Sequence, residues 1–299
     1  MQTLIERLAL YILDDLAKRQ STGQLPDGAL LNHCNIMKVI GALNLNVVDL
    51  TMDMHGNHVI QAFLMIFKAS NLPADENLLG SEMTAQYTQF IFNACTSNCV
   101  EIGRHKHGCC VMQRCLEKGN KIQKLELANY IIMHMNNLIE DPYGNYLVQN
   151  VLKLDDVNRN EMIFENIAKN FIRLSQLKFS SNVIEKCLDS KMRSDRESPI
   201  ERIFRGTFEQ DDQTLLLQTG GNSKGDLNLR INLIVQGLIY NQFGNYVLQK
   251  AISCIYDEGL RNDILMTIKS LQPNLMQMRH GQKVIQKLSK QYPHIFTPF

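Results

Sequence analysis

The sequence predicts an all-α protein built as a right-handed stack of helical repeats, a superhelical solenoid. One segment recurs along the chain at a near-constant spacing, and every copy carries an apolar stripe at the period of an α-helix. No stretch of useful length alternates apolar and polar residues, which is the pattern of a half-buried strand.

The recurring segment starts at Asn57, Cys109, Asn145, Ser181, Asn245 and Gln282, where it reads NHVIQAFL, CCVMQRCL, NYLVQNVL, SNVIEKCL, NYVLQKAI and QKVIQKLS. Successive starts lie 52, 36, 36, 64 and 37 residues apart. A fixed period between about 20 and 50 residues is typical of repeat architectures, in which each unit packs only on its neighbours. The two longer spacings predict two insertions. We place the first near residues 70–85 and the second within residues 193–226, with its inserted loop near 205–226.

The spacing also predicts how the chain is divided. We expect a single repeat domain over residues 1–299, truncated at its N-terminus, in which residues 1–35 are the remnant of an earlier repeat and a linker. The expected repeats are 36–85, 86–120, 121–156, 157–193 and 194–256, followed by a C-terminal cap over 257–299. The expected helices ahead of the copies are 1–20, 36–50, 86–103, 121–138, 157–174, 227–240 and 262–271, with loops at 21–28 and 70–81.

Each copy separates into two faces when its first residue is numbered 0 and each residue advances 100°. Positions 2, 3, 6 and 7 share one side and are apolar, as in Leu147, Val148, Val151 and Leu152, so this stripe is predicted to be core. Positions 0, 1 and 4 lie on the opposite side. In the five complete copies they are Asn57, His58 and Gln61; Cys109, Cys110 and Gln113; Asn145, Tyr146 and Gln149; Ser181, Asn182 and Glu185; and Asn245, Tyr246 and Gln249.

A small polar residue followed four positions later by Gln or Glu fits the reading of RNA bases, one per repeat. The carboxylate of Glu185 only accepts hydrogen bonds, and guanine offers two adjacent donors on its Watson–Crick edge. The Asn–Gln pairs match the edge of uracil, and the Cys–Gln pair matches adenine. The side chains at position 1, several of them flat, are candidates for stacking on bases. Position 5 holds Arg114, Lys186 and Lys250, which we expect to meet phosphates.

With NHxxQ, CxxxQ, NYxxQ, SNxxE and NYxxQ in this order, the chain from Ile36 onward resembles the Pumilio (PUF) family of RNA-binding proteins. The resemblance implies that the five copies are repeats four to eight and that Gln282 begins a half-repeat cap. It implies antiparallel binding of 5′-UGUA, followed by U or A at the Asn57 repeat. It further implies binding to mRNA 3′ untranslated regions, with translation repression or decay through deadenylase or repression factors on the convex face. The chain departs from the family at Cys110, where the adenine repeat usually carries an Arg, so we expect weaker stacking there.

Composition limits the classes of function that the chain can have. The formal net charge is +1, so any contact with nucleic acid depends on local basic residues. The eight cysteines form no paired framework, and no apolar run approaches the ~18–20 residues that span a bilayer. We therefore expect a cytoplasmic, monomeric protein without cofactor or membrane contact. Two alternatives stay open: a protein-binding scaffold without base specificity, and a zinc site at His105, His107, Cys109 and Cys110, with Cys95 and Cys99 nearby. No catalytic motif points to an enzyme.

Overall fold

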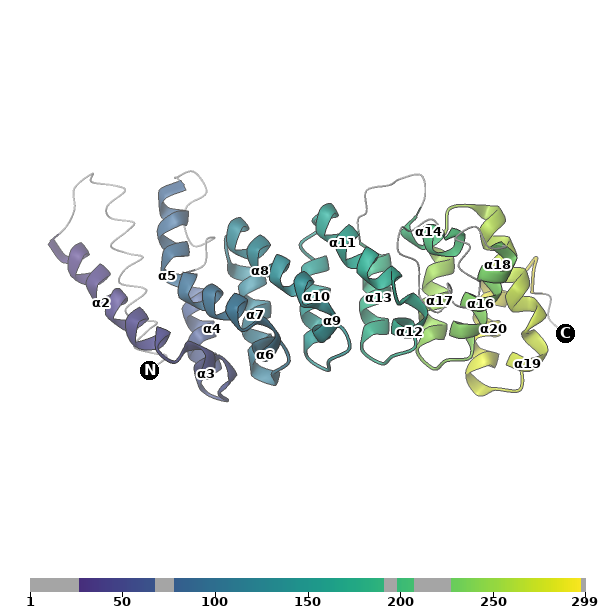
Figure 1. Cartoon of the computed structure of the whole chain (residues 1–299), viewed down its shortest axis with the longest axis horizontal. Coiled ribbons are helices and arrows are strands. Elements are labelled where there is room, and N and C mark those ends of the chain that lie inside the picture. The colour runs from purple at the N-terminus through teal and green to yellow at the C-terminus, as the bar shows by residue number, and fades with distance from the viewer. Residues whose placement is uncertain (1–26, 68–77, 191–197, 207–226, 297–299) are drawn as a thin grey trace. The chain divides into compact units, whose positions relative to one another are not determined.

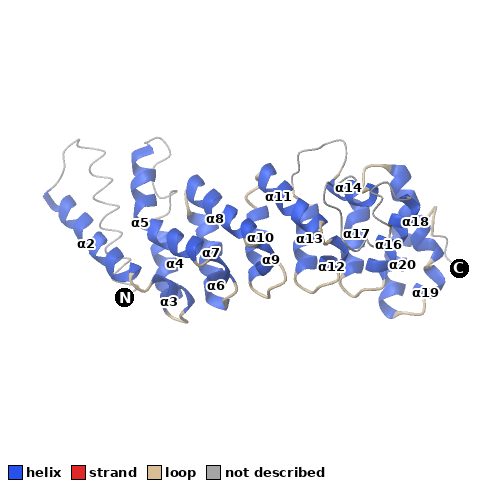
Figure 2. Cartoon of the chain, viewed as in Figure 1, coloured by secondary structure: helices blue, strands red, loops and turns tan. Residues whose placement is uncertain are grey.

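A computed structural model describes residues 27–67, 78–190, 198–206 and 227–296. Every regular element in these ranges is a helix, which confirms the all-α prediction (Figure 2). The chain divides into two compact units, residues 1–150 and 151–299, and the boundary lies inside one helix. The helix expected at residues 1–20 lies outside the described residues, as does the segment 207–226 of the second insertion.

The first unit holds α2 to α10 (Figure 1). Its helices are α2 (Asp27–Asn44), α3 (Val47–Met52), α4 (Gly56–Ile66), α5 (Leu78–Ser97), α6 (Cys99–Gly103), α7 (Lys106–Lys118), α8 (Lys121–Met133), α9 (Met135–Leu138) and most of α10 (Gly144–Leu152). Neighbouring repeats pack helix on helix: α4 lies against α7, and α5 lies against α8. Each repeat thus contacts the next, as the solenoid prediction requires.

The second unit continues the same pattern. Its helices are α11 (Val157–Ala168), α12 (Phe171–Ser175), α13 (Ser180–Leu188), α14 (Pro199–Arg205), α16 (Leu227–Ile239), α17 (Gly244–Ser253), α18 (Glu258–Ser270), α19 (Gln272–Leu275) and α20 (Arg279–Gln291). Here α13 packs against α17, and α16 packs against both α17 and α18. The helices α4, α7, α10, α13, α17 and α20 contain the six copies of the recurring segment, and we call them the reading helices.

The predicted stripe forms the core. Residues at positions 2, 3, 6 and 7 of the five complete copies are buried, except Val59 and Leu188, which are partly exposed. In the last copy Val284, Ile285 and Leu288 are buried as well. Burial of a large aliphatic side chain contributes about 1.5–3 kcal/mol. The apolar stripe is therefore what holds each reading helix in its repeat.

The helix ahead of five of the six copies is broken, and in the first four of these a single helix was expected through the break. The break lies 11 residues before position 0, at Asn46, Asn98, His134, Asn170 and Leu271, and a short helix follows it. Asparagine competes with the helix for backbone hydrogen bonds, which explains three of these breaks. The equivalent residue before the Asn245 copy is Ile234, and α16 is continuous through it.

Three loop predictions need correction. Residues 27 and 28 were assigned to a loop but belong to the first turn of α2. The predicted loop 70–81 ends earlier, because α5 begins at Leu78. The second insertion is not simply a loop, since α14 lies within it.

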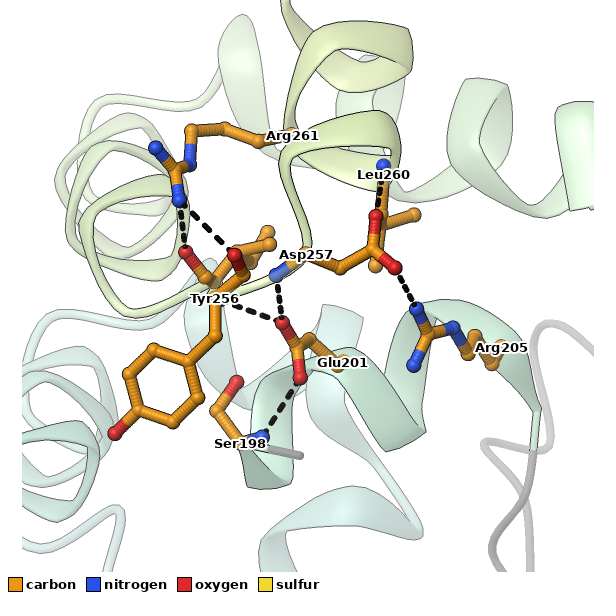
Figure 3. A network of polar contacts seen from close by, with 8 residues as sticks. Ser198, Glu201, Arg205, Tyr256, Asp257, Leu260 and Arg261 are labelled. Atoms are coloured by element: carbon orange, nitrogen blue, oxygen red, sulfur yellow. Dashed lines mark hydrogen bonds and ion pairs between the residues drawn. The ribbon is translucent and has the colours of Figure 1, made fainter. Parts of the chain in front are cut away.

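The helix α14 is fixed at both ends by buried polar side chains. Glu201 is buried, and its carboxylate accepts hydrogen bonds from the backbone N–H groups of Ser198 (2.7 Å), Tyr256 (2.6 Å) and Asp257 (2.7 Å), as Figure 3 shows. At the other end, the buried guanidinium of Arg230 donates to the carbonyl oxygen of Ile203 (2.8 Å). The carboxylate joins α14 to the turn between α17 and α18, so this part of the insertion is an integral layer of the second unit.

No helix in the part of the chain that the structure describes is both long enough and apolar enough to cross a membrane.

Candidate RNA-binding site

The reading helices begin in a turn that is built in the same way in several repeats. In three copies an acidic or amide side chain lies four residues before position 0. It accepts hydrogen bonds from the backbone N–H groups at positions −2 and −1. Asp141 accepts from Tyr143 (2.8 Å) and Gly144 (2.9 Å), and Asp53 and Asn241 make the equivalent pairs of bonds. Sequence reasoning missed this residue, although Asp or Asn four positions before Asn is a repeated signal. The turn fixes the direction of each reading helix relative to the segment before it.

Both carboxylates in these turns, Asp141 and Asp53, have lowered pKa values. Burial alone would raise the pKa of Asp141, but the N–H groups of Gly144 and Tyr143 and the guanidinium of Arg104 (3.0 Å) outweigh it. Hydrogen bonds from the backbone N–H groups of Gly56 and His55 lower the pKa of Asp53. Both side chains are therefore ionised acceptors at neutral pH. Arg104 belongs to the preceding repeat, so its ion pair with Asp141 also joins two neighbouring repeats.

Position 0 was expected on the exposed polar face, but it is buried. Asn57, Cys109, Asn145, Ser181 and Asn245 are only 2–3 % exposed. Each side chain donates a hydrogen bond to the carbonyl oxygen of position −3 in the turn. The acceptors are Met54 (2.9 Å), Lys106 (3.3 Å), Pro142 (3.0 Å), Lys178 (3.4 Å) and Gln242 (3.1 Å). The turn therefore requires a short side chain with a donor hydrogen at position 0, and Asn, Cys and Ser all meet that requirement.

In the three Asn copies, the Asn side chain also orients the Gln at position 4. The Asn Oδ1 atom accepts from Nε2 of Gln61 (3.0 Å), Gln149 (2.9 Å) and Gln249 (3.1 Å). An amide nitrogen has two donor hydrogens, and an amide oxygen has two lone pairs. After the internal bond, Gln61 and Gln149 keep one donor and the acceptor oxygen in a fixed order, whereas Nε2 of Gln249 also donates to the backbone carbonyl oxygen of Asn245 (3.1 Å). The order in Gln61 and Gln149 matches the alternating acceptors and donor on the edge of uracil.

The Cys109 copy is held in a different way. Burial and the neighbouring Cys110 raise the pKa of the Cys109 thiol to about 12, so it stays protonated and donates to the Lys106 carbonyl. Its sulfur is a weak acceptor and lies 3.9 Å from Nε2 of Gln113. The Oε1 atom of Gln113 accepts instead from Nδ2 of Asn150 in the next repeat (3.1 Å). Sequence reasoning gave Asn150 no role.

The Ser181 copy carries a charge where the others carry an amide. Glu185 is partly exposed, and burial raises the pKa of its carboxyl, while Lys250 and Lys287 on the two following reading helices counteract that rise. Lys250 itself forms an ion pair with Asp189. A carboxylate beside two cations is a strong acceptor for paired N–H donors.

Position 1 is exposed in all five complete copies, at His58, Cys110, Tyr146, Asn182 and Tyr246. Tyr146 and Tyr246 expose 51 % and 58 % of their surface, which is far more than a tyrosine packed between repeats would expose. Each of these side chains lies one residue from a buried position 0 and three residues from a position-4 side chain. They are therefore free to contact a planar group held by position 4.

The basic residues at position 5 differ in their surroundings. Arg114 forms an ion pair with Glu117 (2.7 Å), and Lys250 pairs with Asp189. Lys186 has no ion pair among the described residues. Of the three predicted phosphate contacts, Lys186 is the one whose cation is not already matched within the described structure.

The zinc alternative lacks a site in the described part of the chain. No group of three or more His, Cys, Asp or Glu side chains is arranged there to hold a metal ion. His105 instead accepts hydrogen bonds at Nδ1 from the N–H groups of His107 (3.3 Å) and Gly108 (3.4 Å), which is the role of Asp141 in its own repeat. Cys95, Cys99, Cys109 and Cys110 are free thiols.

The chain is similar to proteins with the same repeats. The model of the Pumilio-family RNA binding repeat matches residues 46–65, 98–132, 134–168, 170–191 and 237–266. A Pumilio domain-containing protein of Schizosaccharomyces pombe is 30 % identical over 85 % of the chain and 31 % of its own length. The Pumilio homology domain family member 4 of Saccharomyces cerevisiae is 31 % identical over 74 % of the chain and 21 % of its own length. The chain thus spans less than a third of either relative.

Two solved structures share the fold. The Puf4 RNA binding domain, bound to the HO endonuclease RNA 3′ UTR recognition sequence, aligns with a TM-score of 0.58 at 27 % identity. The alignment covers 84 % of this chain and 67 % of that one. The RNA-binding domain of yeast Puf5p, bound to SMX2 RNA, aligns with a TM-score of 0.60 at 26 % identity, over 84 % of this chain and 65 % of that one.

Proposed function

The chain belongs to the Pumilio (PUF) family of RNA-binding repeat proteins, and we propose that it binds single-stranded RNA by reading one base with each repeat. The preferred sequence is 5′-UGUA, read from the Asn245 repeat to the Cys109 repeat, with a further U or A at the Asn57 repeat. The base-edge contacts come from positions 0 and 4, and the stacking contacts come from position 1. No step in this function requires catalysis or a cofactor.

The observation that carries the proposal is the combination of an exposed position 1 with an oriented position 4. A protein-binding scaffold has no need to fix the donor and acceptor order of three Gln side chains at 2.9–3.1 Å. Base recognition does need this order, because donors and acceptors on the base edges are what distinguish one base from another. The scaffold therefore remains the second candidate, and base specificity is the property that separates the two.

The relatives support a proposal for the cellular role. The solved Puf4 domain is bound to a 3′ UTR recognition sequence. We propose that this chain likewise binds 3′ untranslated regions of mRNA in the cytoplasm, and that it represses translation or promotes decay by recruiting deadenylase or repression factors. The position-5 cations Arg114, Lys186 and Lys250 would contact phosphates, with Lys186 contributing most because it has no ion pair among the residues that the structure describes.

The test exchanges the reading set of one repeat for that of another. The double variant Ser181→Asn, Glu185→Gln gives the repeat the set found at Asn145 and Gln149. Fluorescence anisotropy at fixed salt would compare short RNAs that contain UGUA and UUUA. The wild type should prefer UGUA by about 1–3 kcal/mol, the range for a base-edge contact, and the variant should prefer UUUA.

Two outcomes would contradict the proposal. Equal, weak binding of both RNAs by the wild type would favour the scaffold. A preference for UGUA that persists unchanged in the double variant would remove Ser181 and Glu185 from base recognition.

A further inference from the structure

The last reading helix, α20, carries a stripe of four exposed cations. They recur at spacings of four, four and three residues, so they share one side of the helix: Arg279, Lys283, Lys287 and Lys290. Lys283 and Lys287 occupy positions 1 and 5 of the last copy, which places the stripe on the polar face of that copy. We call these four residues the cap stripe.

No acidic side chain balances the cap stripe. Asp263 is the last acidic residue in the sequence, and the 36 residues that follow it contain five Lys or Arg. The first 263 residues contain 26 basic and 30 acidic side chains, so the excess of positive charge is concentrated at this end of the chain. None of the four cations forms an ion pair within the described residues, whereas Arg114 pairs with Glu117 on α7.

This arrangement is unfavourable for the helix alone. Like charges three or four residues apart on a helix repel each other, and the cap stripe contains three such pairs. Arg279 is also the first residue of α20, where the helix dipole disfavours a cation. Only Lys290, in the last turn, lies where the dipole favours a cation. A bound anion would remove the repulsion, so the cap stripe has the charge and the exposure of an anion-binding surface.

The cap stripe lies next to the proposed path of the RNA. Lys287 acts together with Lys250 on the carboxyl group of Glu185, where both cations counteract the rise of its pKa that burial causes. The stripe is therefore close to the side chain that we assign to guanine. In antiparallel binding, each later repeat meets a nucleotide further toward the 5′ end. Because the Asn245 repeat takes the first U, the nucleotides that precede UGUA reach α20.

The last copy lacks the features that read a base in the other copies. Gln282 at position 0 is exposed, whereas position 0 is buried in the five complete copies. Its Nε2 atom donates to the carbonyl oxygen of Met276 (2.8 Å), six residues earlier, and not to that of position −3. Position 1 is Lys283, which has no flat ring to stack on a base. Lys and Arg only donate hydrogen bonds, and phosphate oxygens accept them, so this copy matches the RNA backbone.

We propose that the cap stripe binds the phosphates of the RNA segment 5′ of UGUA, independently of the sequence of that segment. This inference rests on the proposed function and extends the binding site beyond the bases that the five complete copies read. It also accounts for how a chain with a formal net charge of +1 holds a polyanion, because its unpaired cations gather at one end of the reading helices. Phosphate contacts release counterions, so the contribution of the stripe must fall as the salt concentration is raised.

Four RNAs that share one UGUA core test the inference by fluorescence anisotropy. One starts at the first U of the core. The others add to its 5′ end four cytidines, four abasic nucleotides, or four cytidines joined by uncharged methylphosphonate linkages. We expect the wild type to bind the cytidine and abasic RNAs about tenfold more tightly than the core at low salt, with a gain that shrinks as salt is raised. The uncharged extension should give no gain.

Three variants locate the effect. Arg279→Gln with Lys283→Gln removes two cations of the cap stripe and keeps Lys287, whose charge acts on Glu185. Arg279→Lys with Lys283→Arg keeps both charges. Lys121→Gln with Lys169→Gln is the matched control, since both lysines are exposed, lie outside the reading helices and have no ion pair among the described residues. We expect only the first variant to lose most of the gain from the 5′ extension. Its melting temperature should not fall, because it removes like-charge repulsion.

The outcomes separate the inference from the proposed function. A wild type that prefers UGUA over UUUA but gains nothing from a charged 5′ extension would overturn the inference alone, and would leave the cap stripe to an acidic protein partner. An abasic extension without effect would overturn it too, since the cap would then read a base. So would an unchanged gain in the first variant, or an equal loss in the Lys121 and Lys169 control. If the wild type binds UGUA and UUUA equally, the proposed function fails and the inference fails with it.

Discussion

Replacement of Gly144 by alanine should destabilise the chain, although alanine usually stabilises a helix. Gly144 is the first residue of α10 and directly precedes Asn145. A Cβ atom at this position would lie 2.8 Å from the carbonyl oxygen of Leu138 and 2.9 Å from its Cα. Both are backbone atoms of α9 in the same repeat, so neither can move aside as a flexible side chain would. Forcing an extra methyl group into such a contact costs about 1–3 kcal/mol.

Another glycine offers a matched control, for which the same replacement should change the stability in the opposite direction. Gly41 lies in α2 and has no atom within 4 Å of the place that a Cβ would occupy. Gly41→Ala should therefore stabilise the chain by about 0.5–1 kcal/mol, the ordinary difference in helix propensity. Urea denaturation followed by helical circular dichroism would compare the two variants with the wild type. The reasoning is refuted if Gly144→Ala is as stable as the wild type or more stable.

A third variant tests why the next repeat carries a serine at the position of Gly144. The residue equivalent to Gly144 in the next repeat is Ser180, whose hydroxyl donates to the carbonyl oxygen of Leu174 at 2.6 Å. Leu174 occupies the place of Leu138 in its own repeat. The hydroxyl therefore binds the carbonyl oxygen that a methyl group would only crowd. We expect Gly144→Ser to be more stable than Gly144→Ala and less stable than the wild type.

Two further predictions concern RNA binding. Burial raises the pKa of Glu185 above its ordinary value, and guanine needs the ionised carboxylate, so the preference for UGUA over UUUA should fall as the pH is lowered from neutral into the acidic range. The native state holds this proton more tightly than the unfolded chain, so the same group lowers stability as the pH rises from the ordinary pKa of a glutamate to the raised pKa of Glu185. A flat pH profile in the wild type, like the one expected of Glu185→Gln, would contradict this. Tyr246→Ala should weaken binding of UGUA by about 1–3 kcal/mol while leaving the melting temperature unchanged, because the ring is 58 % exposed. A lower melting temperature with unchanged affinity would instead assign the ring to packing.

The core could be predicted from the sequence because it depends on period alone. Positions 2, 3, 6 and 7 recur in every copy, and a helix that buries one stripe must place these residues together. The same argument placed position 1 in solvent, where Tyr146 and Tyr246 lie. It failed at position 0 because a helical wheel describes one helix in isolation. The preceding turn folds over the position-0 side chain and covers it.

The insertion helix α14 was missed although its start carries a recognisable signal. Ser198, Pro199 and Glu201 form the pattern of a helix N-terminus, with Pro at the first position and Glu two residues later. What the sequence alone does not reveal is that the Glu201 carboxylate binds N–H groups some 55 residues away, at Tyr256 and Asp257. Long-range contacts of this kind depend on how the repeats stack, and no local pattern encodes them. Asn150 escaped notice for the same reason, since its partner Gln113 lies 37 residues earlier.

The structure changes the role that the position-0 side chain has in base recognition. All five complete copies use this side chain to donate to the carbonyl oxygen of position −3, whether the side chain is an amide, a thiol or a hydroxyl. Its small size and donor hydrogen are thus explained by folding alone. The information that distinguishes one repeat from another must then come from position 4 and its partners. An Asn oxygen accepts from the Gln amide in the three Asn copies, whereas Gln113 accepts from Asn150 of the next repeat. It follows that a substitution at position 4 changes specificity with little effect on the turn, whereas a substitution at position 0 alters the turn and the reading together.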